Sequence, residues 1–198
     1  MKLFKLLTLL MYLLIASCDS HLAENNEERY KILSLLIDEF GKPIIPPNEV
    51  LGLPPFSEQQ IDSIHNQKLN IGIYPVLQNV SSEFKNLNSY DDSFHALIRE
   101  LAKDDSNLKI EISNLRLSKP YNPIIVDTIQ LKNDRYYIKD NYDKLITFSN
   151  IAFDENLQKA AIVISVNMGP LNGISSLVLL EKKKDLWYIK SSRTFLIS

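Results

Sequence analysis

Apolar residues recur every three or four positions in the segment that follows residue 28. Tyr30, Leu33, Ile37 and Phe40 fall on one stripe, with Leu36 beside it. This spacing predicts an amphipathic helix.

The end of this helix is marked by a glycine and a proline. Gly41 fits a left-handed helix cap, and Pro43 prevents the helix from continuing. Five prolines lie in residues 43–55 and favour an extended connection pressed against the core, with a recognition loop as the alternative.

Two further helices and a strand are predicted before residue 102. Ser57 and Gln60 form a capping-box pattern, which predicts a helix to about Lys68, and residues 69–74 read as a strand. Ser89, Asp91 and Asp92 are typical of a third helix start, whose apolar face would be Phe94, Leu97, Ile98 and Leu101.

The period changes to two after residue 107. Leu108, Ile110 and Ile112 alternate with polar residues, and residues 124–127 and 136–139 are rich in strand-forming side chains. We therefore expect the second half of the chain to be mostly β-structure.

Four β-rich runs with short connections occupy the last fifty residues: 148–154, 159–167, 174–182 and 186–195. Such closely spaced strands pair antiparallel, because a parallel crossover needs a dozen or more residues. The pattern predicts an α+β fold of one domain over residues 29–198, in which N-terminal amphipathic helices pack on one face of a C-terminal antiparallel β-meander.

The N-terminus has the three parts of a secretory signal peptide: a basic start at residues 1–5, an apolar run at residues 6–15, and small residues at 16 and 17. The apolar run is too short for a membrane span, which needs about 20 residues.

The sequence Ile15-Ala16-Ser17-Cys18 resembles the lipobox of bacterial lipoproteins. The resemblance implies a signal peptide of residues 1–17, cleavage before Cys18, and acylation of that cysteine with palmitate-like chains. Two or three chains anchor a protein stably. Residues 18–28 would then be the acylated cysteine and a polar tether, and Asp19 leaves the choice between inner and outer membrane open.

Composition and charge fit this assignment. The chain of 198 residues is 45% hydrophobic with a formal charge of −2, which excludes a collagen-like or multi-span protein and argues against nucleic-acid binding. Cys18 is the only cysteine, so a mature chain lacks the thiols for disulfides, thiolate catalysis or cysteine-ligated metals, and no cofactor is expected.

The C-terminal segment contains, in order, Phe148-Ser149, the run 160–166, the loop 168–173, Leu180-Glu181-Lys182-Lys183 and Trp187-Tyr188-Ile189. This order of strings resembles lipoproteins of Bacteroidetes of unknown function. Met168 and Asn172 stand where those proteins carry cysteines. The resemblance implies no activity.

Few residues suggest catalysis. The five glycines form no phosphate-binding loop and no nucleophile elbow. His95 is the weak catalytic candidate, because Asp91 lies one helical turn before it and could orient the imidazole. No other histidine has a matching spacing, and an ordinary exposed helix is the alternative.

Two loose groups of side chains complete the candidates. The acidic series Asp127, Asp134, Asp140 and Asp143 does not fit a calcium loop, so solvated loops are expected. A second group could form an aromatic surface for sugar or peptide, or fill the core instead; it consists of Tyr136, Tyr137, Tyr142, Trp187 and Tyr188.

The sequence thus favours a lipid-anchored, non-enzymatic binding or accessory protein of the bacterial cell envelope. It would face the periplasm or the exterior, contact the lipid bilayer through acylated Cys18, and bind an envelope protein. The alternative is a small envelope hydrolase centred on His95 and Asp91.

Overall fold

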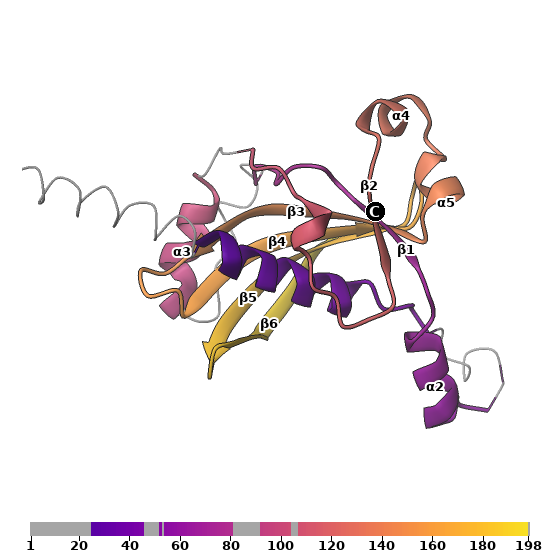
Figure 1. The fold of residues 1–198 in the computed structure, drawn as a ribbon, viewed down its shortest axis with the longest axis horizontal. Coiled ribbons are helices and arrows are strands. Elements are labelled where there is room, and N and C mark those ends of the chain that lie inside the picture. The colour runs from indigo at the N-terminus through magenta and orange to yellow at the C-terminus, as the bar shows by residue number, and fades with distance from the viewer. Residues whose placement is uncertain (1–24, 46–51, 53, 81–91, 104–106, 198) are drawn as a thin grey trace, which may run out of the picture.

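The structure is a computed structural model that describes residues 25–45, 52, 54–80, 92–103 and 107–197. In these residues a six-stranded sheet with the strand order β2-β1-β3-β4-β5-β6 forms the centre of the molecule (Figure 1). The strands are β1 (Asn70–Ile73), β2 (Asn122–Ile125), β3 (Lys144–Phe153), β4 (Lys159–Asn167), β5 (Gly173–Lys183) and β6 (Leu186–Ile197).

Strands β3 to β6 form the predicted antiparallel meander. β4 has the predicted bounds, whereas β3 begins at Lys144, earlier than the expected residue 148. A tight turn joins β5 to β6, with φ of 48° at Lys184 and 62° at Asp185. Left-handed backbone at both positions matches the twist of a two-residue hairpin. The α+β prediction is confirmed.

The remaining two strands add a parallel part to the sheet. β1 pairs in parallel with β2 on one side and with β3 on the other. β1 confirms the strand predicted over residues 69–74, and β2 overlaps the run at residues 124–127. Long connections separate these three strands along the chain, as parallel pairing requires.

Helices pack on both faces of the sheet. Residues 25–40 form a helix, indigo in Figure 1, that crosses the meander with its predicted apolar stripe buried against residues such as Ile162 and Val178. The opposite face, with Ala161 and Leu179, is covered by α3 (His95–Leu101), which follows a 3-10 turn at Asp92–Phe94. The expectation of one covered face is wrong, because β4 and β5 carry apolar residues at consecutive positions and bury both faces.

A bulge in β3 changes which of its side chains point to each face of the sheet. Ser149 and Asn150 together lie opposite the single β4 residue Val163, between the pairs formed by Phe148 and Ile151. One extra residue reverses the alternation of side chains. Phe148 and Ile151 therefore both face the helix of residues 25–40.

The second helix, α2 (Glu58–His65), begins with the predicted capping box. Gln60 N donates to Ser57 Oγ at 3.3 Å, and Ser57 N donates to Gln60 Oε1 at 2.9 Å. The helix ends at His65, before the predicted Lys68, and none of its side chains is buried. Its caps therefore account for much of its local order.

Two predicted β-segments are wrong. Residues 136–139 belong largely to the short helix α5 (Tyr137–Asn141), because Asp134 Oδ1 accepts a hydrogen bond from Tyr136 N at 2.8 Å and turns the chain there. Residues 108–112 form only an isolated bridge at Lys109 before a 3-10 turn at Ile112–Asn114. A further short helix, α4 (Thr128–Asn133), follows β2.

Gly41 is needed for a reason other than the predicted left-handed cap. Its φ is not positive. A Cβ at this position would lie 2.4 Å from Ile37 O and 2.9 Å from Tyr121 Cε2. The glycine thus permits the close approach of the Tyr121 ring to the end of the helix.

Candidate functional site

The weak catalytic pair is not assembled in the described part of the chain. Asp91 lies outside the described residues. His95 is the first residue of α3, and its Nδ1 lies 3.5 Å from Asp92 Oδ1, with side-chain exposures of 43% and 99%. An ion pair between side chains this exposed contributes little to the stability of the fold. Among the described residues, no three His, Cys, Asp or Glu side chains are grouped to hold a metal ion.

The predicted anchor also falls outside the described residues, which start after the signal peptide, Cys18 and most of the tether. In the described residues, no helix combines the length and the apolar character of a membrane span. Much of the proline-rich connection is likewise outside them.

The acidic series has local structural roles. Asp127 Oδ1 caps α4 by accepting hydrogen bonds from Ile129 N at 2.8 Å and Gln130 N at 3.1 Å. Asp143 Oδ2 accepts one from Asn70 N at 2.7 Å, which joins the starts of β1 and β3. These carboxylates therefore satisfy backbone donors.

The predicted aromatic group is divided between the two faces of the sheet. Tyr142 packs against Gly72, and its hydroxyl lies 3.2 Å from that of Tyr137. Burial, together with the hydrogen bond to Tyr137, raises the pKa of Tyr142 to about 12. Trp187 is buried in the core on the face of the N-terminal helix. These residues do not form one aromatic surface.

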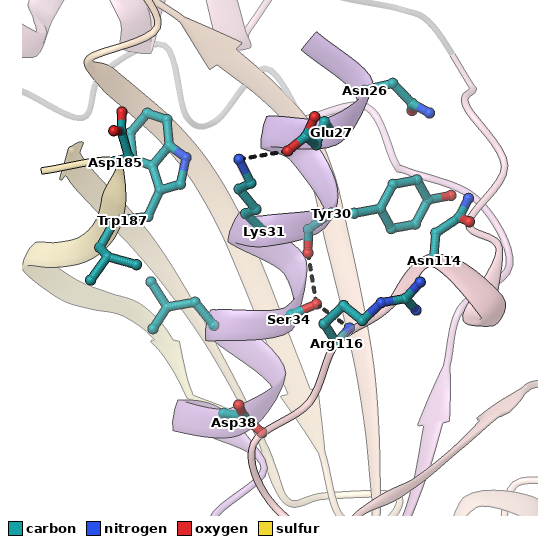
Figure 2. Close-up of a pocket in the computed structure, with 12 residues that line it drawn as sticks. Asn26, Glu27, Tyr30, Lys31, Ser34, Asp38, Asn114, Arg116, Asp185 and Trp187 are labelled. Carbon is teal, nitrogen blue, oxygen red and sulfur yellow. Dashed lines mark hydrogen bonds and ion pairs between the residues drawn. The ribbon is translucent and has the colours of Figure 1, made fainter. Parts of the chain in front are cut away.

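A groove of about 690 Å³ runs over the solvent side of the helix of residues 25–40 (Figure 2). The helix is its floor, and its two walls are the β5–β6 hairpin and the loop that contains the turn at residues 112–114. The lining residues are Asn26, Glu27, Tyr30, Lys31, Ser34, Leu35, Asp38, Asn114, Arg116, Asp185, Leu186 and Trp187.

The floor follows from the helical pattern of the sequence. Glu27, Lys31 and Leu35 recur every four positions, so they share the side of the helix away from the buried stripe. Lys31 Nζ lies 2.8 Å from Glu27 Oε1. Hydrogen bonds to Glu27 and Glu28 raise the pKa of Lys31 to about 12.

One flank of the helix holds the loop wall through three side chains at four-residue spacing. Tyr30 Oη accepts a hydrogen bond from Glu111 N at 2.9 Å. Ser34 Oγ donates to Tyr30 O at 2.7 Å and accepts from Arg116 N at 2.9 Å, as the dashed lines in Figure 2 show. Asp38 accepts from the backbone N–H groups of residues 118 and 119 at 2.7 and 3.1 Å.

The other wall is held by a buried carboxylate. Glu28 is 4% exposed, and its oxygens accept hydrogen bonds from Lys31 Nζ at 2.9 Å and Trp187 Nε1 at 2.5 Å, with Lys182 Nζ at 3.0 Å. Burial alone would raise the pKa of Glu28, but hydrogen bonds from Lys31, Lys182 and Trp187 outweigh it and lower the pKa. We call these four residues the Glu28 cluster.

A second buried charge lies at the far end of the floor. Lys144, from β3, is 5% exposed, and its Nζ donates to Phe40 O at 3.0 Å and to Lys42 O. It thereby satisfies carbonyls at the helix C-terminus, where a cation is favoured. Burial lowers the pKa of Lys144 to about 8.

No relative helps to interpret this groove. The chain matches no protein-family model, no curated protein and no solved structure. The chemistry of the lining must therefore be read from the residues themselves.

That lining is suited to binding. The lining contains no histidine or cysteine. Its one serine is Ser34, whose hydroxyl is hydrogen-bonded to backbone groups of Tyr30 and Arg116. Leu186 is 73% exposed on the hairpin wall, beside the buried Trp187. Exposed apolar surface flanked by fixed charges can accept a protein segment without a reaction.

Sequence reasoning missed the residues that build the groove. The sequence predicts Glu28 in the tether, although a carboxylate beside an apolar helical stripe is a weak signal of a buried partner. No sequence signal points to Ser34, Asp38 or Lys144, because their partners lie about eighty to one hundred residues away in the chain.

Proposed function

We propose that this protein is a lipid-anchored binding protein of a bacterial cell envelope, which holds a segment of a partner protein in the groove over its N-terminal helix. The groove carries the proposal, because the described part of its floor starts at residue 25, seven positions after Cys18. An acylated Cys18 would thus present the groove close to the membrane surface, towards the periplasm or the exterior.

The lining favours a protein segment over a catalysed substrate. The groove lies across a helix between two walls, and its polar side chains are largely engaged with backbone or with each other. Apolar contact is available from Leu35 and Leu186, with the edge of Trp187 beside them. Partly apolar grooves with aromatic residues are typical of protein interfaces.

The anchor is tested by Cys18→Ala in the full chain. We expect loss of labelling with a fatty-acid analogue and transfer of the protein from the membrane to the soluble fraction, because a thiol is needed for the thioether. Unchanged labelling and partitioning would contradict the anchor.

The groove is tested by a photo-crosslinking amino acid at Leu186, with the same substitution at Ile129 as a matched control. The two side chains are 73% and 70% exposed, but Ile129 lies in α4, outside the groove. We expect a defined adduct with an envelope protein from position 186 only. Equal adducts from both positions, or none from position 186, would contradict the proposal.

His95→Ala separates this function from the hydrolase alternative. A binding protein keeps the Leu186 adduct, because His95 does not line the groove. Loss of an envelope-degrading activity in this variant, with the adduct unchanged, would favour the hydrolase.

A further inference from the structure

The polar contacts of the Glu28 cluster join three separate elements at the hairpin wall. Lys31 belongs to the N-terminal helix, Lys182 to β5, and Trp187 to β6. Lys182 Nζ also lies 5.8 Å from the centre of the Trp187 ring. One carboxylate thus accepts donors from the floor and from both strands of the wall.

The wall itself is short and stiff. The turn at Lys184 and Asp185 has only two residues, and Trp187 packs against Phe153 with ring centroids 6.0 Å apart. The groove is lined by Asp185 of this turn and by Leu186 and Trp187, which follow it. Their distance from the floor is therefore constrained where Glu28 binds the hairpin.

We propose that Glu28 is a positioning residue, which fixes the hairpin wall against the helical floor and so sets the width and the affinity of the groove. The statement about affinity rests on the proposed function, whereas the statement about the wall does not. Glu28 touches no partner in this role, because its side chain lies beneath the lining.

A neutral amide cannot replace this carboxylate. Glu28 accepts donors on both oxygens, and every donor is a cation or an indole N–H. A glutamine offers one oxygen, and its NH₂ group would face another donor. At least one buried donor would lose its partner, which favours movement of the hairpin away from the helix.

Trp187 is a native reporter of this movement, because it is the only tryptophan of the chain. The test measures its emission and its quenching by acrylamide in the full chain in mild detergent. We expect Glu28→Gln to shift the emission to longer wavelength and to increase quenching, because the indole becomes solvated.

Glu27→Gln is the matched control. It removes a neighbouring carboxylate that also contacts Lys31, but the Glu27 side chain is 70% exposed and this contact stays within the helix. This control should leave the emission of Trp187 unchanged. Equal behaviour of Glu28→Gln, Glu27→Gln and the wild type would overturn the positioning role.

Lys182→Met keeps the test decisive if Glu28→Gln fails to fold. It removes one donor and leaves Glu28 bonded to Lys31 and Trp187, so we expect a smaller shift in the same direction. Unchanged Trp187 emission in this variant would then overturn the proposal.

The crosslink at Leu186 separates the two proposals. If Glu28→Gln shifts the Trp187 emission and lowers the yield of the Leu186 adduct, both parts of the inference are supported. If the emission shifts at an unchanged yield, the effect on affinity is wrong. If the wild type gives no adduct, the proposed function fails, and the emission still decides the positioning role.

Discussion

Replacement of Lys144 by Met should change how the stability of the protein depends on pH. The Lys144 ammonium is 5% exposed and faces carbonyl oxygens of residues 40 and 42, and burial lowers its pKa from 10.5 to about 8. Between these two values the unfolded chain binds more protons at this site than the folded chain does. The wild type therefore gains stability as the pH rises through this window.

The size of the effect follows from the two pKa values. One pKa unit corresponds to about 1.36 kcal/mol, so the folded state carries a cost of about 3 kcal/mol while the buried amine stays charged in both states. Between about pH 7 and about pH 9.5, roughly 2 kcal/mol of this cost should disappear. Methionine has a similar length and no charge, so this dependence is absent in Lys144→Met.

Urea unfolding followed by circular dichroism at both pH values measures the free energy of unfolding of each chain. The difference between wild type and variant isolates Lys144, since both chains share all other titrating groups. It should shift by about 2 kcal/mol in favour of the wild type at the higher pH. A difference that does not change with pH would show that the carbonyl acceptors offset the burial, and the reasoning would be refuted.

Three further substitutions and one control at an exposed site test the fold. Phe148→Ala, in the core below the N-terminal helix, should cost about 3–5 kcal/mol in urea unfolding, whereas Ile129→Ala at an exposed site should stay within about 0.5 kcal/mol; a small loss at Phe148 would contradict the packing. Ser57→Ala should cost α2 about 0.5–2 kcal/mol, seen as faster amide exchange over residues 58–65 with little change in global stability; unchanged exchange would show that the cap is dispensable. Gly41→Ala should lower the unfolding free energy by about 1–3 kcal/mol, because its Cβ would meet Ile37 O and the Tyr121 ring; a neutral result would contradict the requirement for glycine at this position.

The predictable part of the fold is the part with clear local signals. Regular apolar spacing predicts the buried stripe of the N-terminal helix, and β-rich runs with short connections predict the four meander strands. The strand predicted at residues 136–139 is wrong. The turn stabilised by the Asp134 carboxylate determines the local structure there, despite the strand-like composition. The second covered face was missed, since consecutive apolar residues in β4 do not reveal how many layers pack on them.

The groove was beyond prediction for a different reason. Its floor, its loop wall and its hairpin wall come from residues 26–38, 114–116 and 185–187. Their juxtaposition depends on long-range contacts, such as those of Glu28 with Trp187 and of Ser34 with Arg116. A single sequence shows polar residues at these positions, but nothing in their spacing pairs them.

The two buried charges explain why the floor can act as a fixed surface. Among the described residues, Glu28 and Lys144 are the charged side chains that are buried, and they hold the N-terminal helix towards its two ends. Glu28 joins it to the hairpin, and Lys144 joins its terminal carbonyls to β3. Burying a charge is costly unless it is bonded, so each ion restricts the helix to one arrangement. A surface ordered in this way before binding spends less of its contact energy on ordering, which favours recognition by a fixed groove.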